Sequence, residues 1–346
     1  MIEQIENTLY VLTQGAYLHL SGETAIIEKE GEKLLQVPLH HIGGVVIFGN
    51  VMVSPFFLHR CAEEGRSVTL ATEYGRFKAR IEGPVSGNVL LRQAQYALQN
   101  DVVRSVTLVR SIIAGKIHNT RGLLLRSRRE QKDGNGDRAD RLGLVADRLS
   151  AILRVLPECN DIEVLRGHEG AAAHMAFSVY NDLIRVDDPL FSFEERSRRP
   201  PRNRFNALLS FLYMLVTGDC AAALETVGLD PQAGYLHTLR PGRPALALDL
   251  AEEFRSLLAD RLTVALINRR QIDSSDFEER TGGAILLGEN GRKKVLAAWQ
   301  KRKQEEVGHP ELARSIPLGL APMIQARLLA RFIRGESQAY VPFVPR

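Results

Sequence analysis

The sequence predicts an α+β protein, in which an N-terminal β-strand domain (residues 1–86) is followed by a larger all-helical C-terminal domain (residues 87–346). Two observations predict this class. Short alternating segments punctuated by Gly-containing turns fill the N-terminal part, and a helical spacing of apolar residues begins at Val89. The length of 346 residues also favours two domains over one.

In the N-terminal domain, apolar and polar residues alternate and Gly supplies the turns, as in Ser21-Gly22 and Glu30-Gly31. The expected strands are residues 8–13, 17–21, 24–29, 33–37, 42–48, 67–71 and 77–81. Residues 54–64 have helical spacing, with Ser54 as N-cap. Residues 83–88, rich in Gly and Pro, predict a linker.

In the C-terminal domain, apolar residues recur at three-to-four spacing from Val102 to Ile117, which predicts an amphipathic helix. Asn160 and Glu163 resemble a capping box that opens another helix. Further helices are expected over residues 169–183, 206–216 and 249–268.

The composition is that of an ordinary globular protein, with 45% hydrophobic and 25% charged residues. A net charge of +4 permits a polyanionic partner without requiring one. Three cysteines without a CxxC pair argue against a disulfide framework or a structural zinc site. The N-terminus does not resemble a signal peptide, and we expect a cytoplasmic protein without a membrane partner.

Basic residues gather in three places, around residues 121–132, 196–204 and 292–303. A solvated face near a helix C-terminus explains any one of these clusters. Three clusters together favour nucleic acid, because arginine and lysine neutralise phosphates. The DNA-binding candidates are Arg126, Arg128, Arg129, Arg198, Arg199, Arg202, Arg204, Lys293 and Lys294.

No phosphate-binding loop, dinucleotide fingerprint, zinc-protease motif or serine-hydrolase motif is present in the sequence. Dispersed oxygen and nitrogen ligands remain. Glu169 is followed by small residues that would let a ligand approach, although a glutamate in the first turn of a helix is the simpler reading. His237 follows a loop containing Asp230-Pro231 and Gly234, and imidazole is a common metal ligand and general base.

Asp249 and Glu252 are three residues apart, so both side chains can share one helix face. This spacing suits a shared divalent metal, and it suits a capping box with Asp249 as N-cap equally well. A set of Glu169, His237 and one acidic residue of the run 249–253 would favour Mg²⁺ or Mn²⁺, since hard carboxylates dominate it. A zinc hydrolase fits poorly, because the ligands are dispersed and include no cysteine.

At these residues the chain resembles the CRISPR-associated endonuclease and integrase of spacer acquisition, the first of the numbered Cas proteins. Four segments in order carry the resemblance. They are Glu169-Gly170 with the small residues after it, Arg199-Pro200-Pro201 running into 206–213, Gly228-Leu229-Asp230-Pro231 through His237, and residues 247–255. The overall pattern is most similar to members found with type I-C systems.

The resemblance implies an N-terminal β-domain that dimerises and a helical catalytic domain. It implies Glu169, His237 and Glu252 as metal ligands and catalytic residues, with Asp249 close behind. The implied activity is metal-dependent cleavage of DNA and insertion of short duplexes into a CRISPR repeat array, in which a 3′-hydroxyl attacks a phosphodiester. The implied partners are double-stranded DNA, a second copy of the chain and a small second CRISPR-associated adaptation protein.

Two departures from the family pattern concern only connecting loops. Arg202 to Phe205 stands where relatives often have an Asp-Pro lead, and Ser256 stands where a proline commonly follows Phe254-Arg255. The alternative hypothesis is a non-catalytic DNA-binding scaffold protein, which the arginine clusters alone would explain. It predicts salt-sensitive DNA binding without metal-dependent turnover.

Overall fold

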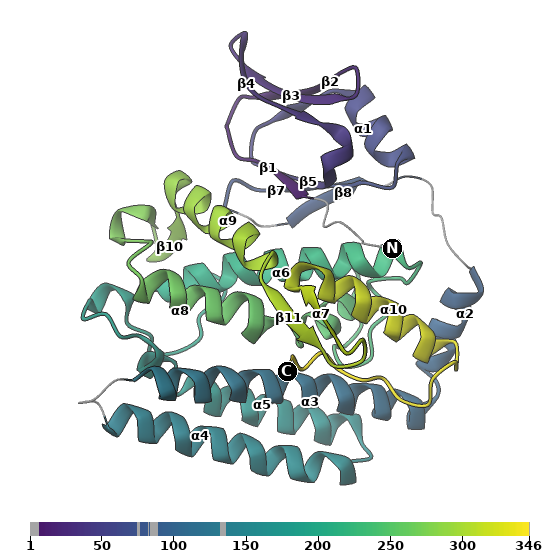
Figure 1. Ribbon diagram of the computed structural model, residues 1–346, viewed down its shortest axis with the longest axis vertical. Helices are drawn as coiled ribbons and strands as arrows, with labels where there is room; N and C mark the ends of the chain where they lie inside the picture. Colours follow the sequence, from purple (N-terminus) through teal and green to yellow (C-terminus); the bar gives the residue numbers. More distant parts are fainter. Residues whose placement is uncertain (1–6, 75–76, 82, 84–88, 132–135, 346) are drawn as a thin grey trace. The chain divides into compact units, whose positions relative to one another are not determined.

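The computed structural model describes residues 7–74, 77–81, 83, 89–131 and 136–345 (Figure 1). The chain divides into two compact units. Unit 1 comprises Met1–Gly87 and Leu287–Gln300, and unit 2 comprises Asn88–Leu286 and Lys301–Arg346. The predicted domain boundary at residue 86 and the dimerising role of the N-terminal domain stay predictions. The predicted linker lies outside the described residues except for Gly83.

Unit 1 contains two four-stranded sheets, with strand orders β4-β3-β2-β6 and β1-β5-β7-β8. The strands are β1 (Asn7–Val11), β2 (Tyr17–Ser21), β3 (Thr24–Lys29), β4 (Glu32–Pro38), β5 (Ile42–Phe48), β6 (Met52–Val53), β7 (Ser67–Ala71) and β8 (Phe77–Ile81). Each predicted strand is confirmed to within two residues. Strand β6 was missed because two residues carry no readable alternation.

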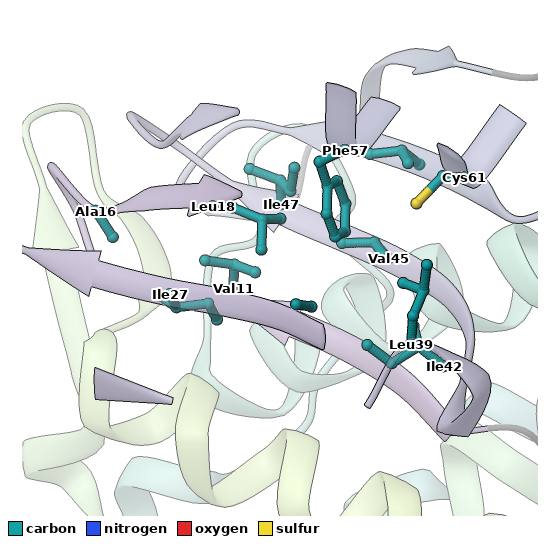
Figure 2. Close-up of a cluster of buried hydrophobic side chains, with 12 residues drawn as sticks. Val11, Ala16, Leu18, Ile27, Leu39, Ile42, Val45, Ile47, Phe57 and Cys61 are labelled. Carbon is teal, nitrogen blue, oxygen red and sulfur yellow. The ribbon is translucent and has the colours of Figure 1, made fainter. Parts of the chain in front are cut away.

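The core of unit 1 lies between its two sheets and helix α1 (Pro55–Glu63), as Figure 2 shows. Leu18, Val45, Phe57 and Cys61 are almost completely buried there. Alternation places one face of each strand in this core, and burial of each large apolar side chain contributes about 1.5–3 kcal/mol. Pro55 at the first helical position, after Ser54, begins α1 as predicted, although the Ser54 side chain makes no capping hydrogen bond.

Unit 2 is built mainly from helices. They are α2 (Val89–Leu98), α3 (Val102–Glu130), α4 (Gly136–Val155), α5 (Ile162–Phe177), α6 (Arg204–Thr226), α7 (Ala245–Ala251), α8 (Arg261–Asn268) and α10 (Ala321–Ile333). Helices α3, α4 and α5 pack side by side (Figure 1). Helix α9 (Glu289–Lys303) lies largely within the part of the chain assigned to unit 1.

Helix α6 is the core helix of unit 2. Its N-cap is Asn203, whose side chain accepts a hydrogen bond from the Asn206 amide at 2.7 Å. Among the described residues, α6 is the one helix long and apolar enough to cross a membrane by length and composition. However, 61% of its most apolar window is buried inside the protein, which is the placement of a core helix.

The structure corrects the prediction that the C-terminal domain is all-helical. Two short hairpins are present, one of β9 (Phe277–Arg280) with β10 (Ala284–Leu287) and one of β11 (Glu306–His309) with β12 (Arg314–Pro317). Each strand has only four residues, and β9 is mostly charged, so neither hairpin shows a period-two pattern.

Two helix starts also differ from prediction. Helix α5 begins after Asp161, whose carboxylate accepts hydrogen bonds from the amides of Glu163 and Val164, so Glu169 lies in its interior and not in its first turn. Helix α7 begins at Ala245, so Asp249 is not its N-cap. After α7 the chain makes a turn and continues as the π-helix η5 (Arg255–Asp260), which interrupts the single helix expected over residues 249–268.

Candidate functional site

The three predicted ligands, Glu169, His237 and Glu252, line one pocket in unit 2. Glu169 comes from the middle of α5, His237 from the loop between α6 and α7, and Glu252 from the turn that follows α7. The small side chains Ala172 and Ala173, one turn after Glu169, also line the pocket. Residues far apart in the sequence therefore meet here, as expected for a site assembled from several elements.

Glu252 is a buried carboxylate between two cations. Its side chain is 2% exposed, its Oε2 atom lies 2.6 Å from the Lys116 Nζ atom, and its Oε1 atom accepts from the Arg255 guanidinium. Burial alone would raise the pKa of Glu252, but Arg255 and Lys116 outweigh it and lower this pKa to about 2. Glu252 is therefore ionised at every physiological pH.

Lys116 joins the two carboxylates of the pocket. Its ammonium group, on helix α3, contacts both Glu169 Oε1 and Glu252 Oε2. The Lys116 side chain is only 15% exposed, so this contact is largely shielded from solvent. The two acidic side chains thus converge on one positive charge.

His237 is held by Asp249. The Nδ1 atom of His237 lies 2.7 Å from Asp249 Oδ1, and the Nε2 atom lies 3.6 Å from Glu252 Oε1. Because a carboxylate can only accept, Nδ1 carries a proton, and the Nε2 atom is turned toward Glu252. This carboxylate–imidazole arrangement is the one that orients metal-binding histidines in proteins.

Asp249 is fully buried and uses both oxygens inside the loop. The Oδ2 atom accepts from the amides of Tyr235 (2.7 Å) and Leu236 (3.0 Å), and Oδ1 accepts from the His237 amide (2.9 Å) as well as facing the ring. A Cβ atom on Gly234 would stand 2.7 Å from Asp249 Oδ2 and 2.6 Å from the Ala245 carbonyl carbon. Both oxygens of Asp249 thus hold the histidine loop, and its membership of the ligand set stays a prediction.

The wall of the pocket beyond Glu252 is aromatic and rigid. Tyr213 and Tyr180 donate their hydroxyls to the two oxygens of buried Asp260, each at 2.7 Å. The guanidinium groups of Arg196 and Arg255 lie 5.3 and 5.1 Å from the Tyr213 ring centre. Burial raises the pKa of Asp260, against the hydrogen bonds from both tyrosines. This network fixes the direction of Arg255 toward Glu252.

The donor set can be tested for fit to a divalent metal. Within the described part of the chain, no three carboxylate, imidazole or thiol groups have donor atoms close enough to hold a metal ion as they stand. The carboxylates of Glu169 and Glu252 nevertheless converge on the Lys116 ammonium, which occupies the place of a cation. His237 Nε2 is oriented toward the same carboxylate. Two hard carboxylates and one imidazole are donor types that Mg²⁺ and Mn²⁺ accept.

Arg198 is the DNA-binding candidate that the structure places in the pocket. In the same cluster Arg199 and Arg202 are exposed, whereas Arg196 is partly buried and donates to Asn206 Oδ1 at 2.8 Å. Arg204 lies over the Phe277 ring. The cluster is thus divided between surface groups and structural groups.

The other two clusters give a mixed result. Arg126 pairs with Glu130, Arg128 and Arg129 are exposed, and Lys132 lies outside the described residues. In the third cluster Lys293 and Lys294 are exposed. Three other members of this cluster, Arg292, Arg302 and Lys303, are buried.

Sequence reasoning missed Lys116, Arg255 and Tyr213. Arg255 follows Glu252 by three residues, a spacing that puts both on one helix face and could have indicated the pair. Lys116 lies within a long amphipathic helix, where a lysine ordinarily faces solvent. The packing of α3 against both α5 and η5 brings it into the pocket.

Comparison with known proteins gives a family. Residues 9–301 match the family model described as CRISPR associated protein Cas1. The chain is 52% identical over 340 residues to the CRISPR-associated endonuclease Cas1 1 of Moorella thermoacetica, covering 98% of each. It is 48% identical over 343 residues to the protein of the same name from Chlorobaculum tepidum, again covering 98% of each.

Three solved structures share the fold. A CAS1 protein from Thermotoga maritima has a TM-score of 0.80 at 22% identity, with 96% of this chain and 98% of that chain covered. A casposase bound to integration product has a TM-score of 0.81 at 19% identity, covering 96% and 92%. A Cas6-RT-Cas1–Cas2 complex has a TM-score of 0.83 at 21% identity, covering 99% of this chain and 36% of that chain. The family match and the identities together show that the chain belongs to the Cas1 family of CRISPR-associated proteins.

Proposed function

We propose that this protein is a metal-dependent DNA endonuclease and integrase that inserts short DNA spacers into a CRISPR array. The observation that carries the proposal is the convergence of Glu169, His237 and Glu252 in one pocket with Arg198 and Arg255. The close relatives are named endonucleases, and one structural neighbour is a casposase bound to its integration product.

Glu169, Glu252 and His237 would hold the metal, through their carboxylates and the Nε2 atom. A bound Mg²⁺ or Mn²⁺ supplies stabilisation of the negative charge that develops on a phosphodiester as a hydroxyl attacks it. Hard oxygen donors favour these ions over softer metals.

The other side chains of the pocket orient and neutralise. Asp249 holds the proton on His237 Nδ1, which keeps Nε2 free to bind. Arg255 keeps Glu252 ionised despite its burial. Arg198, at the pocket wall, is placed to neutralise a phosphate of the DNA backbone.

The proposed partners follow from the same comparisons. Double-stranded DNA, as spacer precursor and as CRISPR repeat, is the substrate. A structural neighbour is a complex that contains Cas2, and we propose a small second adaptation protein of this kind as a partner of a homodimer of this chain. The assignment to type I-C systems stays a prediction.

The test compares variants of one helix. Purified wild-type protein with Mn²⁺ should release or join strands of linear and branched DNA. Glu169→Gln should abolish this activity, because it removes a carboxylate ligand. Glu163→Gln, on the same helix α5 with a side chain 76% exposed, is the matched control and should retain activity.

His237→Ala and Glu252→Gln should behave like Glu169→Gln. Full activity in all three variants would contradict the site assignment. Salt-sensitive DNA binding without any metal-dependent strand cleavage or joining in the wild-type protein would instead favour the non-catalytic scaffold.

A further inference from the structure

A short segment after helix α10 forms neither helix nor strand, and yet two of its four side chains are buried. We call this segment, residues 340–343, the strap. Tyr340 is 2% exposed and Phe343 is fully buried. Irregular segments ordinarily run over the surface, because their backbone groups need partners. The partners of the strap therefore indicate what it does.

One partner is Glu253, the residue next to Glu252. Tyr340 Oη donates to Glu253 Oε1 at 2.5 Å, and the Phe343 amide donates to Glu253 Oε2 at 2.7 Å. Gln325 of α10 bonds to both residues of this pair, since its Nε2 atom donates to Glu253 Oε2 at 3.1 Å and to Tyr340 Oη at 2.8 Å. A fully buried carboxylate is thus fixed by three donors, two of which belong to the strap.

The second partner is helix α3, on the turn that carries Lys116. Asn119 Nδ2 donates to the carbonyl oxygens of both Glu253 and Phe343, each at 2.8 Å. The strap also touches α3 directly. A Cβ atom on Gly115 would lie 2.7 Å from Pro342 Cβ, so only glycine lets the strap approach this closely.

We propose that the strap is a positioning element for the pocket, acting on Glu252 through Glu253 and on Lys116 through α3. Helix α7 ends at Ala251 and the π-helix begins at Arg255, so Glu252 lies in a turn that no regular helix holds. The hydrogen bonds to Glu253 replace that support. Metal and substrate sites need their groups held to about 0.5 Å, which such contacts provide.

The strap also has an ordinary packing role, and the test must separate the two. Phe343 stacks on Phe254, with ring centres 5.6 Å apart, and this contact stabilises unit 2 whatever happens in the pocket. A change to the strap that keeps its apolar volume isolates the positioning role. Tyr340→Phe removes only the hydroxyl group, and with it the hydrogen bond that this group donates to Glu253.

A second variant disturbs the strap from the opposite side. Gly115→Ala places a methyl group against Pro342, and the strap must move to make room. Gly122→Ala is its matched control, because Gly122 lies on the same helix and a Cβ atom there meets nothing within 4 Å. Ser105→Ala is the control for Tyr340→Phe, since the Ser105 hydroxyl donates to the Leu98 carbonyl at 2.7 Å, in a buried position outside the pocket lining.

The decisive measurement uses the full chain without metal. His237 does not touch the strap, but its Nε2 atom lies 3.6 Å from Glu252 Oε1, so its ring NMR signals report where Glu252 stands. Tyr340→Phe and Gly115→Ala should shift the His237 ring signals, and both controls should leave them in place. Unchanged His237 signals in both strap variants, with the fold intact, would overturn the proposal.

Mn²⁺ binding gives a second readout, which rests on the proposed function. Loss of an outer support typically weakens metal binding 10–100-fold, so we expect Tyr340→Phe to raise the Mn²⁺ dissociation constant at least about tenfold. If the wild-type protein and Glu252→Gln bind Mn²⁺ equally, the proposed metal site fails, while the His237 signals still decide the role of the strap. An Mn²⁺ affinity in Tyr340→Phe within twofold of a wild type that does bind would count against the strap.

Discussion

Replacement of Lys116 by methionine tests the charge balance of the pocket most directly. The change keeps most of the side-chain volume and removes the ammonium group that Glu169 and Glu252 share. In the metal-free protein these two carboxylates then lie close together with one cation fewer. We expect the metal-free variant to be less stable than wild type. We also expect Mn²⁺ to raise the Tm of the variant by more than it raises that of wild type.

The size of the stability loss follows from the pKa of Glu252. A shift from 4.5 to about 2 corresponds to about 3 kcal/mol in favour of the ionised form. Arg255 and Lys116 are the two main cations behind this shift, so loss of Lys116 should remove roughly half of it, about 1.5 kcal/mol. In a large domain 1 kcal/mol moves Tm by about 2–4 °C, which gives a decrease of roughly 3–6 °C.

The stabilisation by Mn²⁺ should change in the opposite direction, and should be larger in Lys116→Met than in wild type. In the wild-type protein an incoming Mn²⁺ must displace the ammonium, whereas in Lys116→Met no ammonium joins the two carboxylates. Saturating Mn²⁺ stabilises a protein by about 2.7 kcal/mol at one hundred times its dissociation constant. Mn²⁺ should therefore raise the Tm of Lys116→Met by more than it raises that of wild type.

Thermal unfolding with and without Mn²⁺ measures both effects. Lys293→Met is the control, because Lys293 forms an exposed pair with Glu289 that is worth less than about 1 kcal/mol. A Lys116→Met protein that unfolds at the wild-type temperature, and gains no more from Mn²⁺ than wild type does, would refute the idea that Lys116 occupies the place of the metal.

Three further predictions concern single side chains of the pocket. Asp249→Asn should weaken Mn²⁺ binding 10–100-fold in a direct titration, because the asparagine side chain has one acceptor oxygen where Asp249 uses two to hold the histidine loop. The control Asp161→Asn should bind Mn²⁺ normally, since asparagine also caps helices. The lowered pKa of Glu252 contributes stability that is present above about pH 4.5 and lost as the pH falls toward 2. Urea unfolding should thus show the difference in unfolding free energy between wild type and Glu252→Gln shrinking from pH 5 to pH 3, and a constant difference would contradict the low pKa. Arg198→Ala should reduce the salt dependence of DNA binding by about one phosphate contact, and an unchanged slope would remove Arg198 from the DNA surface.

The strands of unit 1 could be predicted because they obey a simple rule. Their apolar residues alternate, and glycines such as Gly22 and Gly31 adopt the positive φ angles that tight turns require. The hairpins of residues 277–287 and 306–317 do not follow this rule, since their strands are short and bury few side chains. Pairing with a neighbouring strand, and not local pattern, produces them.

The site could be predicted only in part. Glu169, His237 and Glu252 were identified, and the structure brings them into one pocket. Whether Asp249 was a cap, a ligand or a support could not be decided from spacing, because a three-residue interval serves all of these roles. The support role became visible only in the structure, where the amides of residues 235–237 all donate to this carboxylate, and a long-range contact of this kind leaves no periodic signal.

Gly234 is a position at which the chain tolerates little change. It has no functional group, and yet the Asp249 carboxylate and the backbone of α7 stand where its side chain would be. Any other residue there would push the histidine loop away from Asp249 and α7. A position without a functional group is therefore one at which substitution should damage the pocket. A substitution can therefore disturb the pocket without changing any of its polar side chains, because the smallest residue of the loop sets how closely the loop approaches α7.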